Sequence, residues 1–320
     1  GGRSTLTGVN HRSISRLESY LPTQKQSKPA VDPTALGEFE RRVQLEKLAG
    51  GGDGPWKLTP AEYQRFGFYR GGRGIFLGLD DSVLPAGVRA TIGLLHTGAS
   101  YDDELSDDSL VYHYPSTRSP GRDAAEIEAT KTASTLGLPL YVIVGSSNPR
   151  EVRRGWVADW DDQQAVFLVE FGAQPSTMNP EEPSKDPFEG KRRRRSRGGS
   201  ALNRDNKFRF RILKEYGSTC GACNISDEHL IQAAHVVPVS AGGADVPANG
   251  IPLCPTHHLA FDSPKIPLTI EPDTLNWVLL DGQPLSSLSI TRLSIRHLRA
   301  TPSRAALQSH HEEASLLLGQ

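Results

Sequence analysis

Two histidines, an asparagine and an aspartate in the last third of the chain are of types that could hydrolyse an ester bond. Asn249 follows His235 by 14 residues, and His258 follows Asn249 by 9. An imidazole titrates near neutral pH and can take a proton from water, whereas an amide can only orient or brace its neighbours. Asp262 follows His258 by four residues, which would put both on one face of a helix. A histidine with a carboxylate suits Mg²⁺ or Mn²⁺ better than a soft metal.

The phrases around these residues resemble the HNH nuclease motif. They are Ala233-Ala234-His235-Val236-Val237-Pro238, Asn249-Gly250, Leu253-Cys254, His257-His258 and Phe261-Asp262. In that family the motif lies on a strand-loop-strand-helix unit, the ββα-metal finger. The resemblance implies that His235 is the general base for phosphodiester hydrolysis and that Asn249 aligns the imidazole or braces its loop. It also implies that His258 binds the catalytic cation, with Asp262 as a second ligand.

One position departs from the common pattern of the family. Many members carry Asp or His just before the base histidine, as a metal ligand, and this chain has Ala234 there. The resemblance then implies two protein ligands, with water and phosphate oxygens completing the shell. A subset of the family shares this variant, so the alanine does not imply inactivity. The plain alternative is that each histidine is an ordinary core or surface residue.

The three cysteines of the chain all lie in the same region. Cys220 and Cys223 form a C-x2-C pair, and Cys254 precedes His257 by the same spacing. Two such pairs make a Cys₃His set, which is common in structural zinc sites. Many HNH proteins have four cysteines here, so the resemblance implies that His257 replaces the fourth and faces zinc. The alternatives are reduced thiols or a Cys220–Cys223 disulfide, which the odd cysteine count and the lack of a secretion signal disfavour.

Charge is distributed unevenly along the 320 residues, although the net charge is only −1. Residues 101–108 are acidic, whereas residues 191–211 are strongly basic. The basic stretch is either a solvated tether or a tether that also contacts phosphates, and the two are compatible. Phosphate contacts are expected above all from Arg192, Arg193, Arg194 and Arg195. No apolar run is long enough to cross a membrane, and we expect a protein of the bacterial cytoplasm.

The hydrophobic spacing predicts the elements that must position these groups. Helices are expected at 33–48, 122–136 and 201–219, and strands at 75–95, 110–114, 138–147 and 154–171. Val236-Val237 is a β-branched pair suited to a strand. The expected division is a polar segment with one helix at 1–60, a recognition domain at 61–171, a Pro- and Arg-rich linker at 172–200, a nuclease domain at 201–275 and an extension at 276–320.

A second phrase, running from Gly98 to Tyr114, resembles the core of the SET-and-RING-associated (SRA) domain. That fold is a PUA-like β-barrel that flips a modified cytosine out of duplex DNA. The resemblance implies a base pocket in which Tyr101 and either His113 or Tyr114 stack on the base, and Asp103 or Glu104 accepts a hydrogen bond from the cytosine amine. Asp108 stands where the family has glycine, and the sequence at His113 also departs. The alternative is that the tyrosines are core residues and the acids a solvated turn.

Together these features predict an α+β chain: an SRA/PUA-like β-barrel domain, a basic linker and a zinc-stapled ββα-metal HNH domain. The expected function resembles that of McrA-type enzymes, which are modification-dependent, type IV-like restriction endonucleases. It would use structural Zn²⁺ and catalytic Mg²⁺ or Mn²⁺ to cut duplex DNA containing 5-methylcytosine, and two strands to cut favour a homodimer. The alternatives are a conventional HNH endonuclease that reads unmodified DNA and a catalytically inactive, zinc-containing DNA-binding protein.

Overall fold

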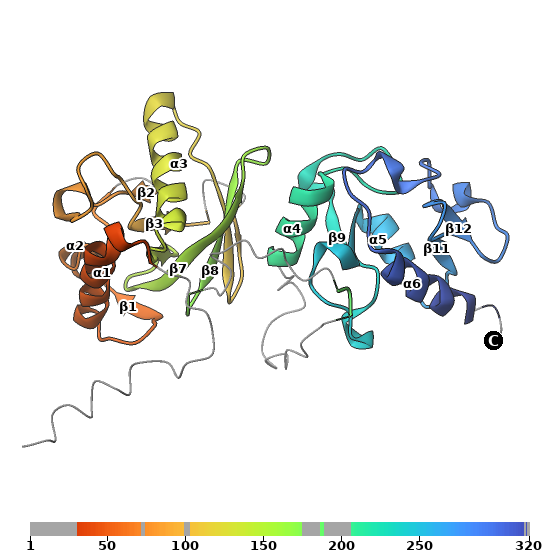
Figure 1. Ribbon diagram of the computed structural model, residues 1–320, viewed down its shortest axis with the longest axis horizontal. Coiled ribbons are helices and arrows are strands. Elements are labelled where there is room, and N and C mark those ends of the chain that lie inside the picture. Colours follow the sequence, from red (N-terminus) through yellow and green to blue (C-terminus); the bar gives the residue numbers. More distant parts are fainter. Residues whose placement is uncertain are drawn as a thin grey trace, which may run out of the picture.

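The computed structural model describes residues 31–71, 74–98, 103–174, 186–188, 206–316 and 318. These form two lobes side by side, an amino-terminal lobe built on a large sheet and a carboxy-terminal lobe of short strands and helices (Figure 1). The run of arginines at 192–195 and Tyr101 lie outside the described residues. None of the described helices is long and apolar enough to cross a membrane.

The amino-terminal sheet has eight strands and is mixed, with one parallel pair, β3 with β6. Its order is β2 (Ile75–Phe76), β3 (Gly93–His96), β6 (Leu140–Val144), β7 (Arg150–Asp161), β8 (Val166–Phe171), β5 (Ser109–His113) and β4 (Glu104–Leu105), and β1 (Trp56–Leu58) also pairs with β7. Among the described residues β2 and β4 end the path without pairing to each other. The expected closed barrel is therefore not seen here, and the lobe is an open, mixed α/β sheet.

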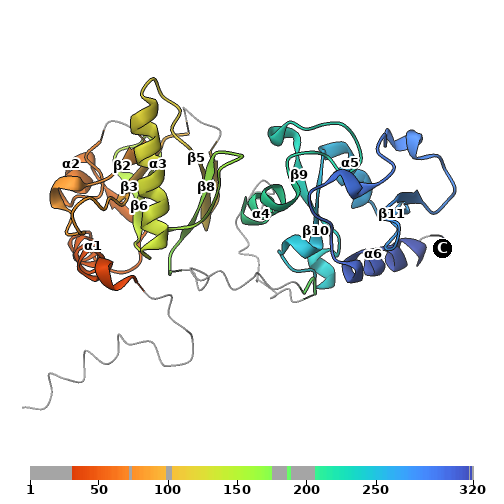
Figure 2. The same ribbon diagram turned by 45° about the horizontal axis from the view of Figure 1, so that its top comes forward.

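Helix α3 (Pro120–Thr135) lies across one face of this sheet, with α1 (Leu36–Leu48) and α2 (Pro60–Arg65) beside its β1 end (Figure 2). Proline at the first position of α3 costs no hydrogen bond, because that N–H has no partner within the helix. Helix α1 is anchored by Arg42, which is 1% exposed, pairs with Glu38 at 2.8 Å and donates to the carbonyl of Thr91 at 2.9 Å. A buried guanidinium must satisfy its donors inside the protein, so these contacts fix α1 against the sheet.

The strand expected at 75–95 is present only at its ends, as β2 and β3. Between them Asp80 and Asp81 lie in a 3₁₀ turn that starts at Leu79, and Pro85 follows. The helices expected at 33–48 and 122–136 correspond to α1, preceded by a 3₁₀ turn at Pro33–Ala35, and to α3. The strand patterns at 110–114, 138–147 and 154–171 correspond to β5, β6 and the β7–β8 hairpin. The long periodic patterns therefore predict the observed helices and strands. The apolar run at 75–95 is interrupted because its acidic residues form a turn.

The carboxy-terminal lobe begins with α4 (Asn206–Tyr216), which falls within the helix expected at 201–219. It continues with β9 (Gln232–His235), β10 (Gly250–Leu253), α5 (Pro255–Phe261), β11 (Leu268–Ile270), β12 (Trp277–Leu279) and α6 (Arg304–Leu316). One buried cluster joins α4 to β10, β11, β12 and α6. Helix α4 packs so closely on β10 that a Cβ on Gly250 would lie 2.3 Å from Ile212 Cδ1, and only glycine fits there.

Helix α4 also faces the amino-terminal sheet, and its basic side chains meet acidic ones. Lys207 Nζ lies 3.3 Å from a carboxylate oxygen of Asp108 and of Glu170, and Arg209 Nη1 lies 2.7 Å from Glu104 Oε1. Phe210 of the same helix is buried in a small apolar cluster with residues of β5 and β8. Part of the basic stretch that predicted phosphate contacts is therefore paired with carboxylates of the other lobe.

Candidate active site and metal centre

The strand-loop-strand-helix unit that carries the two histidines is formed by β9, β10 and α5. Strands β9 and β10 pair antiparallel, with His235 opposite Gly250, and α5 starts two residues after β10 ends. Strand β9 ends at His235, so Val236 and Val237 begin the loop instead of forming the strand expected of a β-branched pair. One face of the His235 ring stacks on Phe208 of α4, with centroids 4.0 Å apart and planes at 13°.

His235 has a carboxylate neighbour that comes from the loop between β9 and β10. Its Nε2 lies 2.8 Å from Asp245 Oδ1. Both side chains are part-exposed, 22% for His235 and 41% for Asp245. An imidazole whose edge contacts a carboxylate and whose face is stacked is held in one orientation, which general acid–base chemistry requires.

Asn249 is fully buried and contacts the loop backbone. Its Oδ1 accepts from the Val237 N–H at 2.8 Å, and its Nδ2 donates to the carbonyls of Val237 and Ala244, both at 3.0 Å. No hydrogen bond joins its amide to His235 among the described residues. A Cβ on Gly243 would lie 1.9 Å from the Val237 carbonyl oxygen, so the loop folds over this amide only with glycine there. Of the two roles considered for Asn249, this geometry matches the brace.

His258 and Asp262 lie together at the end of α5. His258 Nε2 is 3.1 Å from Asp262 Oδ2, and the other ring nitrogen, Nδ1, is 2.8 Å from Gln232 Oε1 on β9. Both ring nitrogens therefore face oxygens that can only accept. When Nδ1 donates to Gln232, the neutral ring keeps a lone pair on Nε2, and that lone pair and the Asp262 carboxylate can both bind a cation. Two ligand atoms at adjacent corners of a Mg²⁺ octahedron stand about 3.0 Å apart. The pair fits a hard divalent cation on an exposed face, where water and phosphate oxygens can complete the shell.

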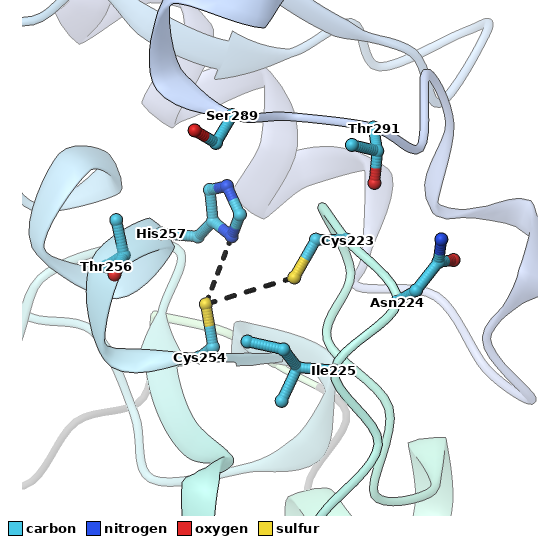
Figure 3. Close-up of a pocket in the computed structure, with 8 residues that line it drawn as sticks. All are labelled: Cys223, Asn224, Ile225, Cys254, Thr256, His257, Ser289 and Thr291. Carbon is cyan, nitrogen blue, oxygen red and sulfur yellow. Dashed lines mark hydrogen bonds between the residues drawn. The ribbon is translucent and has the colours of Figure 1, made fainter.

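The second candidate metal centre contains three thiols and His257. Its ligand atoms all lie within 4.8 Å of one another, and the four residues are buried. Cys254 Sγ is 3.1 Å from His257 Nδ1, and Cys223 Sγ is 4.0 Å from Cys254 Sγ (Figure 3). Cys220 Sγ lies 3.6 Å from His257 Nδ1. Tetrahedral zinc at usual bond lengths separates its ligand atoms by about 3.3 to 3.8 Å. These side chains thus form a four-ligand Cys/His cluster compatible with zinc.

Two further observations fit a cation at this cluster. His257 Nε2 lies 3.1 Å from the Leu288 carbonyl oxygen and donates to it, which leaves Nδ1 unprotonated toward the sulfurs. Burial raises the pKa of the Cys223 thiol to about 12, and the neighbouring Cys220 and Cys254 add to the rise. A dication reverses this effect, because a coordinated thiol loses its proton. The adjacent histidines therefore face different places, His257 the sulfurs and His258 Asp262.

The residues expected to form a base pocket do not all lie together. Asp103 Oδ1 accepts from the His113 N–H at 2.9 Å, and its Oδ2 lies 3.1 Å from His96 Nδ1. Burial by itself would raise the pKa of Asp103, but the hydrogen bonds from His113 and His96 hold it below its usual value. Glu104 instead points to Arg209 of the other lobe.

Tyr114 lies apart from Asp103. Its ring packs on Phe167 with centroids 4.4 Å apart, and its hydroxyl donates to Asp162 Oδ1 at 2.9 Å. Burial and the Asp162 carboxylate raise the pKa of Tyr114 far above its ordinary value. Within the described part of the amino-terminal lobe, the structure therefore brings Asp103 and His113 together and places Glu104 and Tyr114 in other contacts.

The structure adds two residues to the site that the sequence motif does not predict, Asp245 and Gln232. Asp245 is the single acidic residue between His235 and Asn249 in the sequence, a signal that was available. Gln232 has no such signal, since its contact with His258 joins a strand to a helix 26 residues away. Both contacts depend on how the loop and α5 fold back over β9, which the spacing of the motif does not specify.

Comparisons with known proteins bear on this region of the chain. Residues 220–268 match the family described as HNH endonuclease. No curated protein matched the chain in sequence. Among solved structures, the modification-dependent TagI restriction endonuclease is 18% identical with a TM-score of 0.35, over 83% of this chain and 94% of that one. The type IV phosphorothioation-dependent restriction endonuclease ScoMcrA is 15% identical with a TM-score of 0.26, over 85% of this chain and 62% of that one.

The family match includes the cysteine pairs and all of β9, β10 and α5. It thus covers the unit in which His235 stands opposite β10 and His258 meets Asp262. This chain contains an HNH endonuclease domain and is a hydrolase that cleaves the phosphodiester bonds of DNA.

Proposed function

We propose that this chain is a modification-dependent restriction endonuclease that binds duplex DNA containing 5-methylcytosine and cuts it at the HNH site. The observation that carries the catalytic part is the pair of His258 Nε2 and Asp262 Oδ2, 3.1 Å apart, at the end of α5, the helix that follows β10. The pair would supply the nitrogen and oxygen ligands of a hard cation, and His235 of the same strand-loop-strand-helix unit would supply the base.

In the proposed reaction each residue has one task. His235 takes a proton from the water that attacks the phosphorus atom. Asn249 keeps the loop closed over β9, and Gln232 keeps the lone pair of His258 Nε2 directed at the cation position. His258 and Asp262 would hold a Mg²⁺ or Mn²⁺ ion, which would supply positive charge to the phosphate oxygens. Zn²⁺ at Cys220, Cys223, Cys254 and His257 is proposed as the structural ion that holds the two C-x2-C/H turns together.

Recognition of a modified cytosine is proposed for the amino-terminal lobe, whose segment around Asp103 carries the resemblance to modified-base binding domains. The support is a buried carboxylate flanked by two imidazoles, His96 and His113, at the end of strands β3 and β5. A carboxylate has about four lone-pair positions, so three hydrogen bonds leave one for a cytosine amine. Tyr101 is proposed to stack on the flipped base.

The contact between the lobes limits how a base could enter. The cavity lined by Glu104, His113, Arg209 and Glu228 has a volume of about 20 Å³, which holds about one water. A flipped base could meet His113 or Glu104 there only after α4 moves away from the sheet. Such a movement would also release Lys207 and Arg209 toward DNA phosphates, which we propose as partners of these cations as well as of Arg192–Arg195.

A second candidate function, an HNH endonuclease that reads unmodified DNA, is favoured by one specific observation. Asp103 and Glu104 are both satisfied by partners within the protein, the former by His96 and His113 and the latter by Arg209. A structural role explains these acids without any base. Under this alternative the amino-terminal lobe holds α4 in place and does not bind a flipped nucleotide.

The deciding experiment compares one plasmid in unmodified, 5-methylcytosine and 5-hydroxymethylcytosine form, incubated with full-length protein and Mg²⁺ or Mn²⁺. Cutting confined to modified plasmid supports the proposal, and equal cutting of all three sinks the modification-dependent part. The His235→Ala variant should bind modified DNA and not cut it. Absence of cutting by the wild type with either ion would instead favour an inactive DNA-binding protein. Sedimentation of the protein on DNA tests the proposed homodimer, which would place one HNH site on each strand.

A further inference from the structure

The loop between β9 and β10 places one carboxylate against His235. Asp245 Oδ1 lies 2.8 Å from His235 Nε2, a normal hydrogen-bond distance, although the two residues belong to different segments of the unit. The resemblance to the HNH motif assigns no role to Asp245. The position where many HNH proteins have their extra carboxylate is Ala234, whose side chain is buried in the core of the lobe.

The loop that carries Asp245 is held at several points. Asn249 Nδ2 donates to the carbonyl of Ala244, the residue before Asp245, and the Gly243 N–H donates to the Pro238 carbonyl at 3.0 Å. The side chain of Arg211 on α4 donates to the Asp245 carbonyl at 3.4 Å. A carboxylate on a loop tied down on both sides keeps its orientation, as positioning of a catalytic group requires.

The other sides of the His235 ring are also defined. Phe208 covers one face at 4.0 Å, and the ring stands at the end of β9. Asp245 contacts the Nε2 edge, and among the described residues no hydrogen bond to protein involves Nδ1. Since an aspartate carboxylate can only accept, Nε2 carries the proton and Nδ1 keeps its lone pair. Nδ1 is therefore the nitrogen left to take a proton from water.

We infer that Asp245 is a positioning residue for His235: it fixes the imidazole in the tautomer with the proton on Nε2 and steadies the imidazolium formed when Nδ1 accepts the water proton. The same relation exists between the aspartate and histidine of serine protease triads. This inference rests on the proposed role of His235 as the base. The Mn²⁺ dependence in the test below separates this role from direct cation binding by Asp245.

The test compares Asp245→Asn, which keeps the shape and removes the charge, with Asp245→Ala and Asp245→Glu. We expect Asp245→Asn to lower kcat about 10- to 100-fold, with the Kd for DNA and the Mn²⁺ concentration at half-maximal rate unchanged. Asp245→Glu should recover part of the rate. Asp281→Asn is the matched control, because Asp281 is an exposed loop aspartate of the same lobe that accepts only from the Gln283 N–H.

A double variant separates this role from others. If Asp245 acts through His235, adding Asp245→Asn to His235→Ala should not lower the residual rate further. A further drop, a shift of the Mn²⁺ dependence by tenfold or more, or a fall in thermal unfolding midpoint that accounts for the lost activity would each overturn the inference. If His235→Ala alone cuts at the wild-type rate, the proposed base is wrong. If it is inactive while Asp245→Asn is normal, only the inference about Asp245 fails.

Discussion

Polar side chains are satisfied differently in the two lobes. In the amino-terminal lobe two buried charged groups find partners within the chain: Arg42 pairs with Glu38, and Asp103 pairs with His96 and His113. In the carboxy-terminal lobe three buried thiols and His257 converge on one point, with their ligand atoms within 4.8 Å of one another. The first arrangement is complete without a ligand, whereas the second points three sulfur atoms and a ring nitrogen at one position that a dication could occupy.

The same comparison separates the two neighbouring histidines of α5. His257 is 3% exposed and belongs to the buried four-residue Cys/His cluster, while His258 is 23% exposed and contacts a single carboxylate, that of Asp262. Structural metal sites are closed by protein ligands, and catalytic sites keep positions open for water or substrate. The difference teaches that the two ions would have different tasks, one in folding and one in cleavage. The predictions below test this division.

The largest effect is expected from removing Cys254, one of the four proposed zinc ligands. Binding of structural zinc contributes about 10 to 16 kcal/mol in small zinc domains, comparable with the whole stability of a domain. Cys254→Ser, or a strong chelator, should therefore unfold the carboxy-terminal lobe and leave the amino-terminal sheet folded, as hydrogen exchange of each lobe would report. Thr256→Ala, at an exposed position between two ligands, is the control. Equal protection of both lobes without metal would contradict the comparison.

The next effect is on cleavage without unfolding. His258→Ala should lower the rate of DNA cutting by about 10³-fold or more, because the cation that stabilises the phosphate oxygens loses its nitrogen ligand. Thermal unfolding should change little, since the side chain is part-exposed and outside the thiol cluster. His229→Ala, at another exposed histidine of the lobe, should cut normally. A His258→Ala variant that unfolds like Cys254→Ser would erase the distinction between the two histidines.

A smaller effect is expected from Gln232, which orients His258. Gln232→Leu removes the acceptor of the Nδ1 proton at similar size, and should raise the Mn²⁺ concentration for half-maximal cleavage about 10- to 100-fold. Gln232→Glu keeps an acceptor oxygen and should restore most of the affinity. If the Mn²⁺ dependence of Gln232→Leu equals that of the wild type, the contact with His258 has no part in cation binding.

The smallest effect is expected from changing Asp103, whose carboxylate is hydrogen-bonded to His96 and His113 within the amino-terminal lobe. Asp103→Asn should lower the free energy of unfolding by about 1 to 3 kcal/mol, the usual cost of leaving a buried hydrogen-bonding group unpaired. Because the folded pKa of Asp103 lies below the ordinary value of 3.8, its contribution is fully present above that pH and is lost as the pH falls through the folded pKa. Urea unfolding at several pH values should show the wild type and variant converging below pH 3.8.

This variant also distinguishes a structural role from recognition. Lower stability with unchanged preference for methylated DNA would mark Asp103 as an organiser of His96 and His113. Loss of that preference at undiminished stability would mark it as part of a base pocket, and would break the comparison between the lobes.

Much of the fold follows from local patterns in the sequence. The apolar spacing of α1 and α3 and the short apolar runs of β5, β6 and β8 predict those elements, because their lengths and periods match the geometry of a helix or strand. The open edge of the sheet does not follow, since barrel closure depends on whether distant strands meet. The burial of Arg42 is equally invisible locally, because its partners lie at Thr91 and Pro139.

For the site, the sequence alone determined the chemical parts: the Cys/His set at equal spacings, and His258 one helical turn before Asp262. Those relations are local, and a turn or a helix converts spacing into proximity. Only the tertiary structure decided that Asp245 meets His235, that Gln232 holds His258, and that α4 pairs its cations with the other lobe. Such contacts join segments brought together by packing of the whole lobe, and no sequence interval encodes that packing.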